Sequence, residues 1–278
     1  MSIHPTALVD SQAKLERDIE IGPYSIIGPR AVIGKKCVIG SHVVIEGDVQ
    51  MDEHNVIGHG AIIGSAPQDL SFSFQTRSGV RIGSNNTIRE HCTIHRGTAE
   101  GSMTTIGDKN FLMVGAHVGH NCTIGSNVII ANNCLLGGHV EIQDNAFLGG
   151  GCVFHQFIRV GRLAITQGGS AFSADIPPFI MAALLNYAIG LNAVGLKRGG
   201  FTRQQRDELK AAFKLVYTSG LNTSQALERA AEKNWGAVAR EFFDFIAAAK
   251  KRGICAYRGR SEGRACARPG SAEVQPSD

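Results

Sequence analysis

Aliphatic side chains recur at every sixth position of the chain from its N-terminus to residue 160. The series starts at Ile3, is interrupted twice, and then runs without a break from Ile106 to Val160. A period of six matches neither the 3.6-residue period of a helix nor the two-residue alternation of a strand. It is typical of a parallel β-helix built from hexapeptides, with about 18 residues in each three-sided coil. The spacing therefore predicts an all-β prism over residues 1–180.

Two segments interrupt this period and are predicted to leave the prism as loops. The first covers residues 64–81, where Ile63 and Ile82 are 19 positions apart instead of a multiple of six. The second covers residues 95–105, where the phase is kept. Long loops in a tight repeat usually carry function, so both are candidate parts of a site.

Beyond residue 160 the period fades, and residues 181–254 are predicted to form a C-terminal α-helical domain. Thr202 and Gln205 make a capping-box pattern ahead of one amphipathic helix. Two more helices are expected, one from Asn222 or Thr223 and one over residues 238–249.

Composition and charge exclude several classes of protein. A net charge of +4 provides no basic field for nucleic acid. The first ten residues lack the basic and apolar regions of a secretory signal, and no run approaches the roughly 20 apolar residues of a membrane span. We therefore expect a cytoplasmic protein with no nucleic-acid partner and no stable membrane insertion. Residues 255–278 are rich in Gly, Ser and Arg and are expected to be disordered.

Five of the seven cysteines share one position in the six-residue repeat, two residues before an aliphatic side chain. The same position elsewhere holds small residues such as Ala and Ser, so we expect Cys to act there as a small buried hydrophobe. The sequence has no CxxC spacing for zinc. The five are Cys37, Cys92, Cys122, Cys134 and Cys152.

Four of the ten histidines follow the second loop: His117, His120, His139 and His155. A coil of about 18 residues places His139 near the edge that His120 occupies, and His155 near the same edge one coil further. Imidazole is the natural general base near neutral pH, so the cluster is a candidate catalytic site. Three converging imidazoles would also suit zinc, which is the alternative interpretation.

The order of several short motifs resembles one known family. The motifs are PQDL in the first loop, IREHCTIHRGT at 88–98, AHVGH at 116–120, HQF at 155–157, DIPP at 175–178 and GLKR at 195–198. Over about residues 1–252 the chain is similar to the UDP-N-acetylglucosamine acyltransferases that begin lipid A biosynthesis. The resemblance implies a left-handed β-helix homotrimer with its sites in clefts between subunits. It also implies transfer of a 3-hydroxyacyl group from the 4'-phosphopantetheine thioester of acyl carrier protein to the 3-position of a UDP-amino sugar. No other cofactor and no metal are implied.

The same resemblance implies roles for individual residues. His120 matches the family's general base, and the backbone N–H of Gly138 matches its oxyanion donor. Gly168 matches the position at which side-chain bulk sets acyl length, so a glycine would leave a long groove. The positions that match substrate contacts are Gln68, Asp69, His117, His139, His155, Gln156, Asn192 and Arg198.

Three polar positions depart from the family pattern. Asn121 follows the base where the family often has Asp, Ser71 replaces a Lys, and Gly199 replaces an Arg. An asparagine can orient an imidazole but cannot stabilise imidazolium as an anion would. These departures leave open N-acylation of the 3-amino analogue and a non-catalytic scaffold. The hexapeptides, which many acetyltransferases share, also leave open an acetyl-CoA-dependent acyltransferase, and the histidine cluster leaves open a zinc β-helix enzyme of the carbonic-anhydrase kind.

Overall fold

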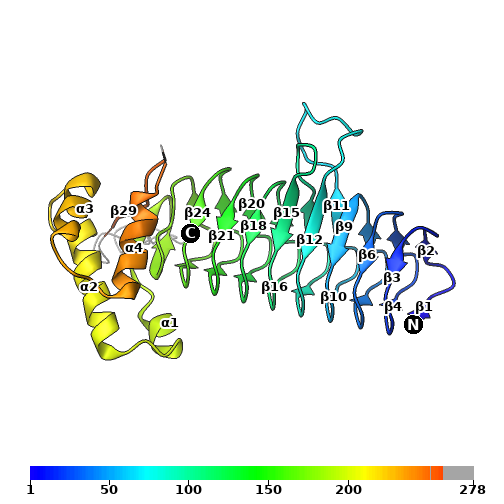
Figure 1. Cartoon of the computed structure of the whole chain (residues 1–278), viewed down its shortest axis with the longest axis horizontal. Helices are drawn as coiled ribbons and strands as arrows, with labels where there is room; N and C mark the ends of the chain where they lie inside the picture. Colours follow the sequence, from blue (N-terminus) through cyan, green and yellow to red (C-terminus); the bar gives the residue numbers. More distant parts are fainter. Residues whose placement is uncertain (251, 259–278) are drawn as a thin grey trace, which may run out of the picture.

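The computed structural model describes residues 1–250 and 252–258, which form a three-sided prism with helices at its C-terminal end (Figure 1). The prism is a left-handed β-helix whose three walls are parallel sheets, as the six-residue period predicts. Sheet A contains β1 (Ser2–Ile3), β4 (Glu20–Ile21), β7 (Val38–Ile39), β10 (Val56–Ile57), β13 (Thr87–Ile88), β16 (Phe111–Leu112), β19 (Ile129–Ile130), β22 (Phe147–Leu148) and β25 (Ile165–Thr166).

The other two walls have the same construction. Sheet B contains β2 (Leu8–Val9), β5 (Ile26–Ile27), β8 (Val44–Ile45), β11 (Ile62–Ser65), β14 (Thr93–His95), β17 (His117–Val118), β20 (Leu135–Leu136), β23 (Val153–Phe154) and β26 (Ala171–Phe172). Sheet C contains β3 (Lys14–Leu15), β6 (Val32–Ile33), β9 (Asp48–Met51), β12 (Gly79–Ile82), β15 (Met103–Ile106), β18 (Thr123–Ile124), β21 (Glu141–Ile142) and β24 (Arg159–Val160).

The aliphatic repeat fills the inside of the prism. Where no loop intervenes, partner residues lie 18 positions apart, so that Val118 stacks on Leu136 and both are fully buried. The five cysteines of the small-residue position are also fully buried, which confirms their structural use. Cys122, for example, donates its thiol to the Gly137 carbonyl of the next coil, at 3.1 Å.

Most corners of the coils have a residue with positive φ, three positions after the inward aliphatic residue. Asn121 (φ 60°), His139 (φ 59°) and Phe157 (φ 67°) occupy this position in three successive coils. Asn and Gly tolerate this conformation best, which explains why Asn recurs there. We call the corners that lead from sheet B to sheet C the B–C edge, and those from sheet A to sheet B the A–B edge.

Both predicted loops exist but are shorter than the sequence indicates. They cover residues 66–78 and 96–102, because β11, β12, β14 and β15 extend beyond two residues and keep pairing into the loop bases. The first loop joins β11 to β12 and the second joins β14 to β15. Both therefore project from the B–C edge, at the top of the prism in Figure 1.

Residues 181–191 are strand rather than helix, which corrects the predicted start of the helical domain. β27 (Ile180–Ala183) and β28 (Tyr187–Leu191) form an antiparallel hairpin that extends sheet A. β29 (Ala256–Tyr257) then pairs with β28, so the predicted disorder is wrong for the first part of segment 255–278. The remainder of that segment, 259–278, lies outside the described residues.

Four helices complete the described chain: α1 (Ala193–Arg198), α2 (Arg203–Tyr217), α3 (Thr223–Ala231) and α4 (Ala237–Ala247). The capping box of Thr202 and Gln205 is confirmed at the start of α2, and Asn222 caps α3 in the same way. The short α1 was not foreseen from the sequence. Within residues 1–250 and 252–258, no helix is long and apolar enough to cross a membrane.

A buried ion pair fixes α4 to the prism. Both Arg159 Nε and Nη2 donate to Asp175 Oδ2, at 2.9 and 2.7 Å, and Nη2 also donates to the Phe245 carbonyl at 3.0 Å. The guanidinium lies over the Phe245 ring, 4.3 Å from its centroid. Asp175, from the DIPP motif, is thus a structural residue that joins the last coil to the helices.

Candidate active site

The B–C edge collects segments that are far apart in the sequence. The first loop, the second loop and the corners after β17, β20 and β23 follow one another along this edge, because each leads from a strand of sheet B to one of sheet C. Most of the residues that the sequence singles out therefore lie on one side of the prism.

His120 and His139 lie in adjacent corners of this edge. Their ring centroids are 5.2 Å apart in an edge-to-face arrangement, which confirms the predicted proximity. Gly138 lies against the His120 ring. A Cβ added to Gly138 would come within 2.5 Å of His120 Nε2. The Gly138 N–H has no hydrogen-bond acceptor among the described residues, so it is available to a ligand.

His155 lies on the B–C edge, as the coil length predicts, but its ring does not continue this stack. The ring that stacks on His139 in the next coil is that of Phe157. The two ring centroids are 4.5 Å apart, and the rings are nearly parallel. Phe157 holds the same corner position as His139 one coil later, whereas His155 comes two residues earlier. His155 is exposed, and its Nδ1 lies 3.1 Å from the Gln156 carbonyl. Gln156 in turn lies over Gly137, in the corner that also contains Gly138 and His139.

His117 belongs to a second histidine pair, on sheet B beside the corner that contains His120. Its ring centroid is 5.1 Å from that of His95, and its Nδ1 is 2.8 Å from Thr93 Oγ1. Burial lowers the pKa of His117 to about 4, and neighbouring His95 adds to the effect. Burial, together with nearby His120, also lowers the pKa of His139. His117 is therefore held as a neutral imidazole at neutral pH.

The first loop places Asp69 near His120. Ser71 holds the Asp69 carboxylate through its backbone N–H, at 2.9 Å, and through its hydroxyl, at 2.7 Å. These hydrogen bonds lower the pKa of Asp69, and nearby His120 adds a smaller effect in the same direction. Ser71, a departure from the family pattern, thus takes part in the turn that presents Asp69. Gln68 is exposed beside it.

The TIHRGT motif ties this loop to the prism, a role that sequence reasoning missed. His95 Nδ1 lies 2.7 Å from the Ala66 carbonyl, and the Arg96 backbone N–H donates to the Ser65 carbonyl. The Arg96 guanidinium also lies 5.2 Å from the centroid of the Phe72 ring. The loop that carries Gln68 and Asp69 is therefore anchored by the motif.

Three predicted site residues lie elsewhere in the same chain. Gly168 is on the A–B edge, in the corner between β25 and β26. Asn192 uses its side chain within the fold, since its oxygen caps α1 at Gly195 N and its amide donates to the Leu163 carbonyl. Arg198 ends α1, is exposed, and has no side-chain partner in the described part of the chain. One chain alone does not bring these three to His120.

No group of three or more His, Cys, Asp or Glu side chains that could hold a metal occurs in residues 1–250 and 252–258. Four histidines on and beside the B–C edge instead form two pairs, His120 with His139 and His95 with His117. This arrangement does not favour the zinc alternative, and the absence of a metal stays a prediction.

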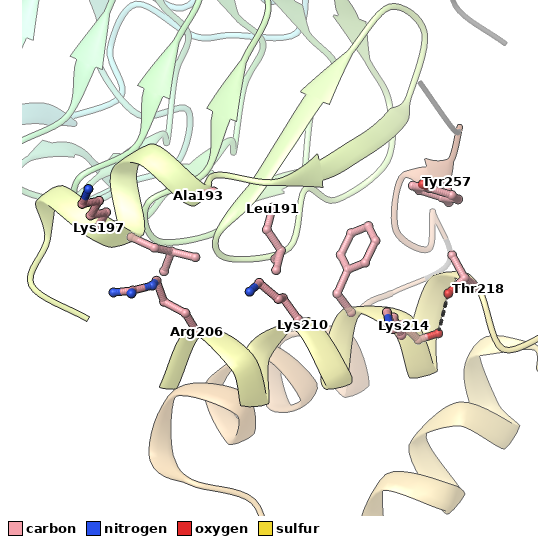
Figure 2. Close-up of a pocket in the computed structure, with 10 residues that line it drawn as sticks. Leu191, Ala193, Lys197, Arg206, Lys210, Lys214, Thr218 and Tyr257 are labelled. Atoms are coloured by element: carbon pink, nitrogen blue, oxygen red, sulfur yellow. Dashed lines mark hydrogen bonds between the residues drawn. The ribbon is translucent and has the colours of Figure 1, made fainter. Parts of the chain in front are cut away.

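A separate cavity of about 560 Å³ lies between α1, α2 and the strand pair β28–β29. Figure 2 shows part of its lining, with Lys197 of α1 at one end and three cations of α2 along the helix that faces Leu191. Phe213 and Leu196 add apolar side chains to the lining. Lys210 pairs with Asp207, whereas Lys197 and Lys214 have no ion-pair partner among the described residues. The cavity is therefore apolar inside and cationic at its rim. The three cations of α2 are Arg206, Lys210 and Lys214.

The chain is similar in sequence and in structure to known acyltransferases. Residues 175–255 match the family model of UDP-N-acetylglucosamine O-acyltransferase domain 2, and residues 103–138 match the bacterial transferase hexapeptide model. The acyl-[acyl-carrier-protein]–UDP-N-acetylglucosamine O-acyltransferase of Paraburkholderia phymatum is 46% identical over 227 residues, which cover 81% of this chain and 86% of that protein. The corresponding enzyme of Thermodesulfovibrio yellowstonii is 40% identical, over 91% of this chain and 98% of that protein.

Solved structures give the same result. The UDP-N-acetylglucosamine acyltransferase of Francisella novicida superimposes with a TM-score of 0.87 at 37% identity, covering 94% of this chain and 96% of that one. The acyltransferase of Campylobacter jejuni gives a TM-score of 0.86 at 38% identity, covering 92% of this chain and 100% of that one.

Proposed function

The chain belongs to the UDP-N-acetylglucosamine O-acyltransferase family, and on this basis we propose that it transfers a 3-hydroxyacyl chain from acyl carrier protein to the 3-hydroxyl of UDP-N-acetylglucosamine, the first step of lipid A biosynthesis. The observation that carries the proposal is the contact between His120 and Gly138 on the B–C edge. It places a candidate base beside a free backbone N–H.

The reaction is a single acyl transfer. His120 Nε2 removes the proton of the sugar hydroxyl while that oxygen attacks the thioester carbonyl carbon. The tetrahedral oxyanion accepts a hydrogen bond from the Gly138 N–H, the C–S bond breaks, and the proton on His120 passes to the departing thiolate. A positioned base contributes typically 10²–10⁴-fold, and one oxyanion donor about 3–4 kcal/mol. No cofactor beyond the phosphopantetheine arm of the donor is required.

The neighbouring polar groups fit recognition of a sugar. Asp69 is an acceptor-only carboxylate that Ser71 holds in place, so it suits a sugar hydroxyl as donor. His139 borders the base, and Gln156 borders the same corner. We assign both to acceptor binding, together with Gln68, His117 and His155, and we assign Asn192 and Arg198 to the nucleotide end of the substrate.

The proposed site needs two chains. His120 lies on the B–C edge and Gly168 on the A–B edge three coils later, roughly 14 Å along the axis at about 4.8 Å per coil. The width of sheet B separates these edges within one chain. Its outer face carries the exposed apolar residues Leu135 and Val153, 43% and 42% exposed. In a cyclic homotrimer, the A–B edge of one chain can face the B–C edge of the next, with an acyl groove between them.

The cation-rimmed cavity supports the choice of donor. A phosphopantetheine arm carries a phosphodiester, and ammonium groups such as those of Lys197 and Lys214, which have no ion-pair partner among the described residues, attract such an anion and steer its carrier protein. We therefore place the docking surface of acyl carrier protein on α1 and α2, beside the last coils of the prism.

The test is an acylation assay with purified protein. The acceptors are UDP-N-acetylglucosamine and its 3-amino analogue, and the donors are 3-hydroxyacyl carrier proteins of graded chain length and acetyl-CoA. We expect O-acylation from the carrier protein, abolished by His120→Ala, and shorter accepted chains after Gly168→Met. Turnover of acetyl-CoA alone, or an unchanged rate in His120→Ala, would contradict the proposal. A preference for the amine would favour N-acylation, which asks less of the base because a neutral amine is the better nucleophile.

A further inference from the structure

The orientation of the Asn121 amide is fixed by the second loop. The backbone N–H of Thr98 lies 3.1 Å from Asn121 Oδ1, and the Thr98 hydroxyl lies 3.0 Å from the same atom. The two ends of an asparagine amide are normally assigned from their hydrogen-bond network. A backbone N–H can only donate, so the atom that faces Thr98 must be the oxygen.

This orientation decides which nitrogen of His120 carries the proton. His120 Nδ1 lies 3.0 Å from the same Asn121 oxygen. A carbonyl oxygen cannot donate, so Nδ1 must be protonated, and the lone pair of the neutral ring is on Nε2. An asparagine that presented its NH₂ group instead would impose the opposite tautomer, which disables a histidine base.

Both ends of the second loop hold Asn121. Thr98 contacts its side chain at the start of the loop, and the Asn121 backbone N–H donates to Thr104 Oγ1 at 2.8 Å, where the loop ends. The Thr104 hydroxyl in turn donates to the His95 carbonyl at 2.6 Å, and Thr104 is fully buried. The loop is thus connected to the base through hydrogen bonds at both of its ends.

The corner position of Asn121 does not by itself require these contacts. Asn127 and Asn133 occupy the same positive-φ position in nearby corners, and neither makes a side-chain hydrogen bond within the described residues. The backbone conformation explains why Asn is present, whereas the contacts of Asn121 Oδ1 with Thr98 and His120 are additional. These additional contacts indicate that Asn121 has a role in the chemistry of His120.

We infer that Thr98 is a positioning residue for the reaction: through Asn121 Oδ1 it holds His120 in the Nδ1–H tautomer, so that Nε2 is presented to the acceptor hydroxyl. This inference rests on the proposed function, in which His120 is the general base. A neutral amide sets the tautomer without the electrostatic stabilisation that a carboxylate would give to imidazolium. The second loop is therefore part of the catalytic apparatus.

The test combines pH profiles of kcat/KM with ¹⁵N NMR of the His120 ring in the full chain. Asn121→Gly keeps the positive-φ corner but removes the oxygen, and we expect a mixture of tautomers and a kcat about 10-fold or more below wild type. Thr98→Val removes one donor to that oxygen, and we expect a smaller fall in kcat at unchanged KM, restored by Thr98→Ser. Asn121→Asp should raise the pH of the acidic limb by about 1 unit or more.

Two matched controls separate these effects from changes in folding. Asn127→Gly alters the same corner position between sheets C and A, without a histidine contact, and Thr123→Val removes an exposed threonine of β18. Both should keep the wild-type pH profile. A pure Nδ1–H tautomer together with a wild-type rate in Asn121→Gly would overturn the inference. An unchanged rate in His120→Ala would instead overturn the proposed base, whatever the tautomer.

Discussion

Gly138 lies so close to the His120 ring that a Cβ at this position would come within 2.3 Å of Cε1. Real Cβ atoms do not approach carbon or nitrogen to such a distance, so any side chain must displace the ring. Glycine at this position therefore meets two requirements. It leaves room for the His120 imidazole, and its backbone N–H stays available to a substrate.

We expect Gly138→Ala to lower kcat by about 10²-fold or more, because the displaced ring loses its alignment with the oxyanion donor. Steady-state kinetics with acyl carrier protein as donor measure this loss, and thermal unfolding shows whether the fold is retained. A variant with the wild-type kcat and the wild-type Tm would show that the contact between Gly138 and His120 has no role in catalysis.

The low pKa of His117 predicts that the folded chain becomes less stable at acidic pH. Its pKa of about 4 in the folded chain lies below the ordinary value of 6.5. Between these two values the unfolded chain binds a proton that the folded chain does not, so stability falls as the pH falls through this window. We expect His117→Gln to reduce the drop in Tm between pH 6.5 and pH 4 by about 2–6 °C. Equal drops in both proteins would mean that His117 is not buried as a neutral ring.

The repeat predicted the prism because one signal, the spacing of aliphatic side chains, sets both the strand and the corner of every coil. The same spacing located the loops but not their lengths, since strand pairing continues into the loop bases through residues such as Gly79. The hairpin β27–β28 was missed, because a two-stranded extension at the end of a sheet has no period of its own.

The site was predicted only in part, and the reason is geometric. Counting 18 residues per coil predicted that His120 and His139 lie close together. It did not predict that the next ring along the edge, at the corner position of His139, is that of Phe157 and not that of His155. Contacts between loops, such as Thr98 with Asn121, depend on where the loop backbone folds back. The spacing of residues along the sequence does not predict such contacts.

The buried pair of Arg159 and Asp175 predicts how firmly α4 is attached. Asp175 is 3% exposed and accepts three hydrogen bonds from Arg159, so its loss leaves an unpaired charge in the interior. We expect Asp175→Ala to lower the free energy of unfolding by about 3–5 kcal/mol, measured by urea denaturation. Glu241→Gln, at the more exposed pair with Arg162, should cost only about 1 kcal/mol or less. Equal effects would contradict the ranking by burial.

The cationic rim of the cavity predicts donor binding that depends on salt. We expect the double variant Lys197→Glu/Lys214→Glu to raise KM for acyl carrier protein by about 10-fold or more at low salt, with kcat little changed, because rim charges act mainly on encounter. Wild-type KM should rise with ionic strength, and that of the variant should rise less. Lys36→Glu, at an exposed corner far from the cavity, is the control. An unchanged KM in the double variant would contradict the proposal that acyl carrier protein docks on α1 and α2.

The separation of His120 from Gly168 predicts that inactive chains can complement each other. His120→Ala removes the proposed base, and Gly168→Trp fills the predicted acyl groove on the A–B edge, so a homotrimer of either variant alone should be inactive with long acyl donors. If each cleft takes its B–C edge and its A–B edge from different chains, about a quarter of the clefts in randomly mixed trimers receive both intact residues. Co-expression should therefore restore about a quarter of the wild-type rate, whereas mixing the two preassembled trimers should not. A site built within one chain would give no restoration in either experiment, since every chain would carry one defect.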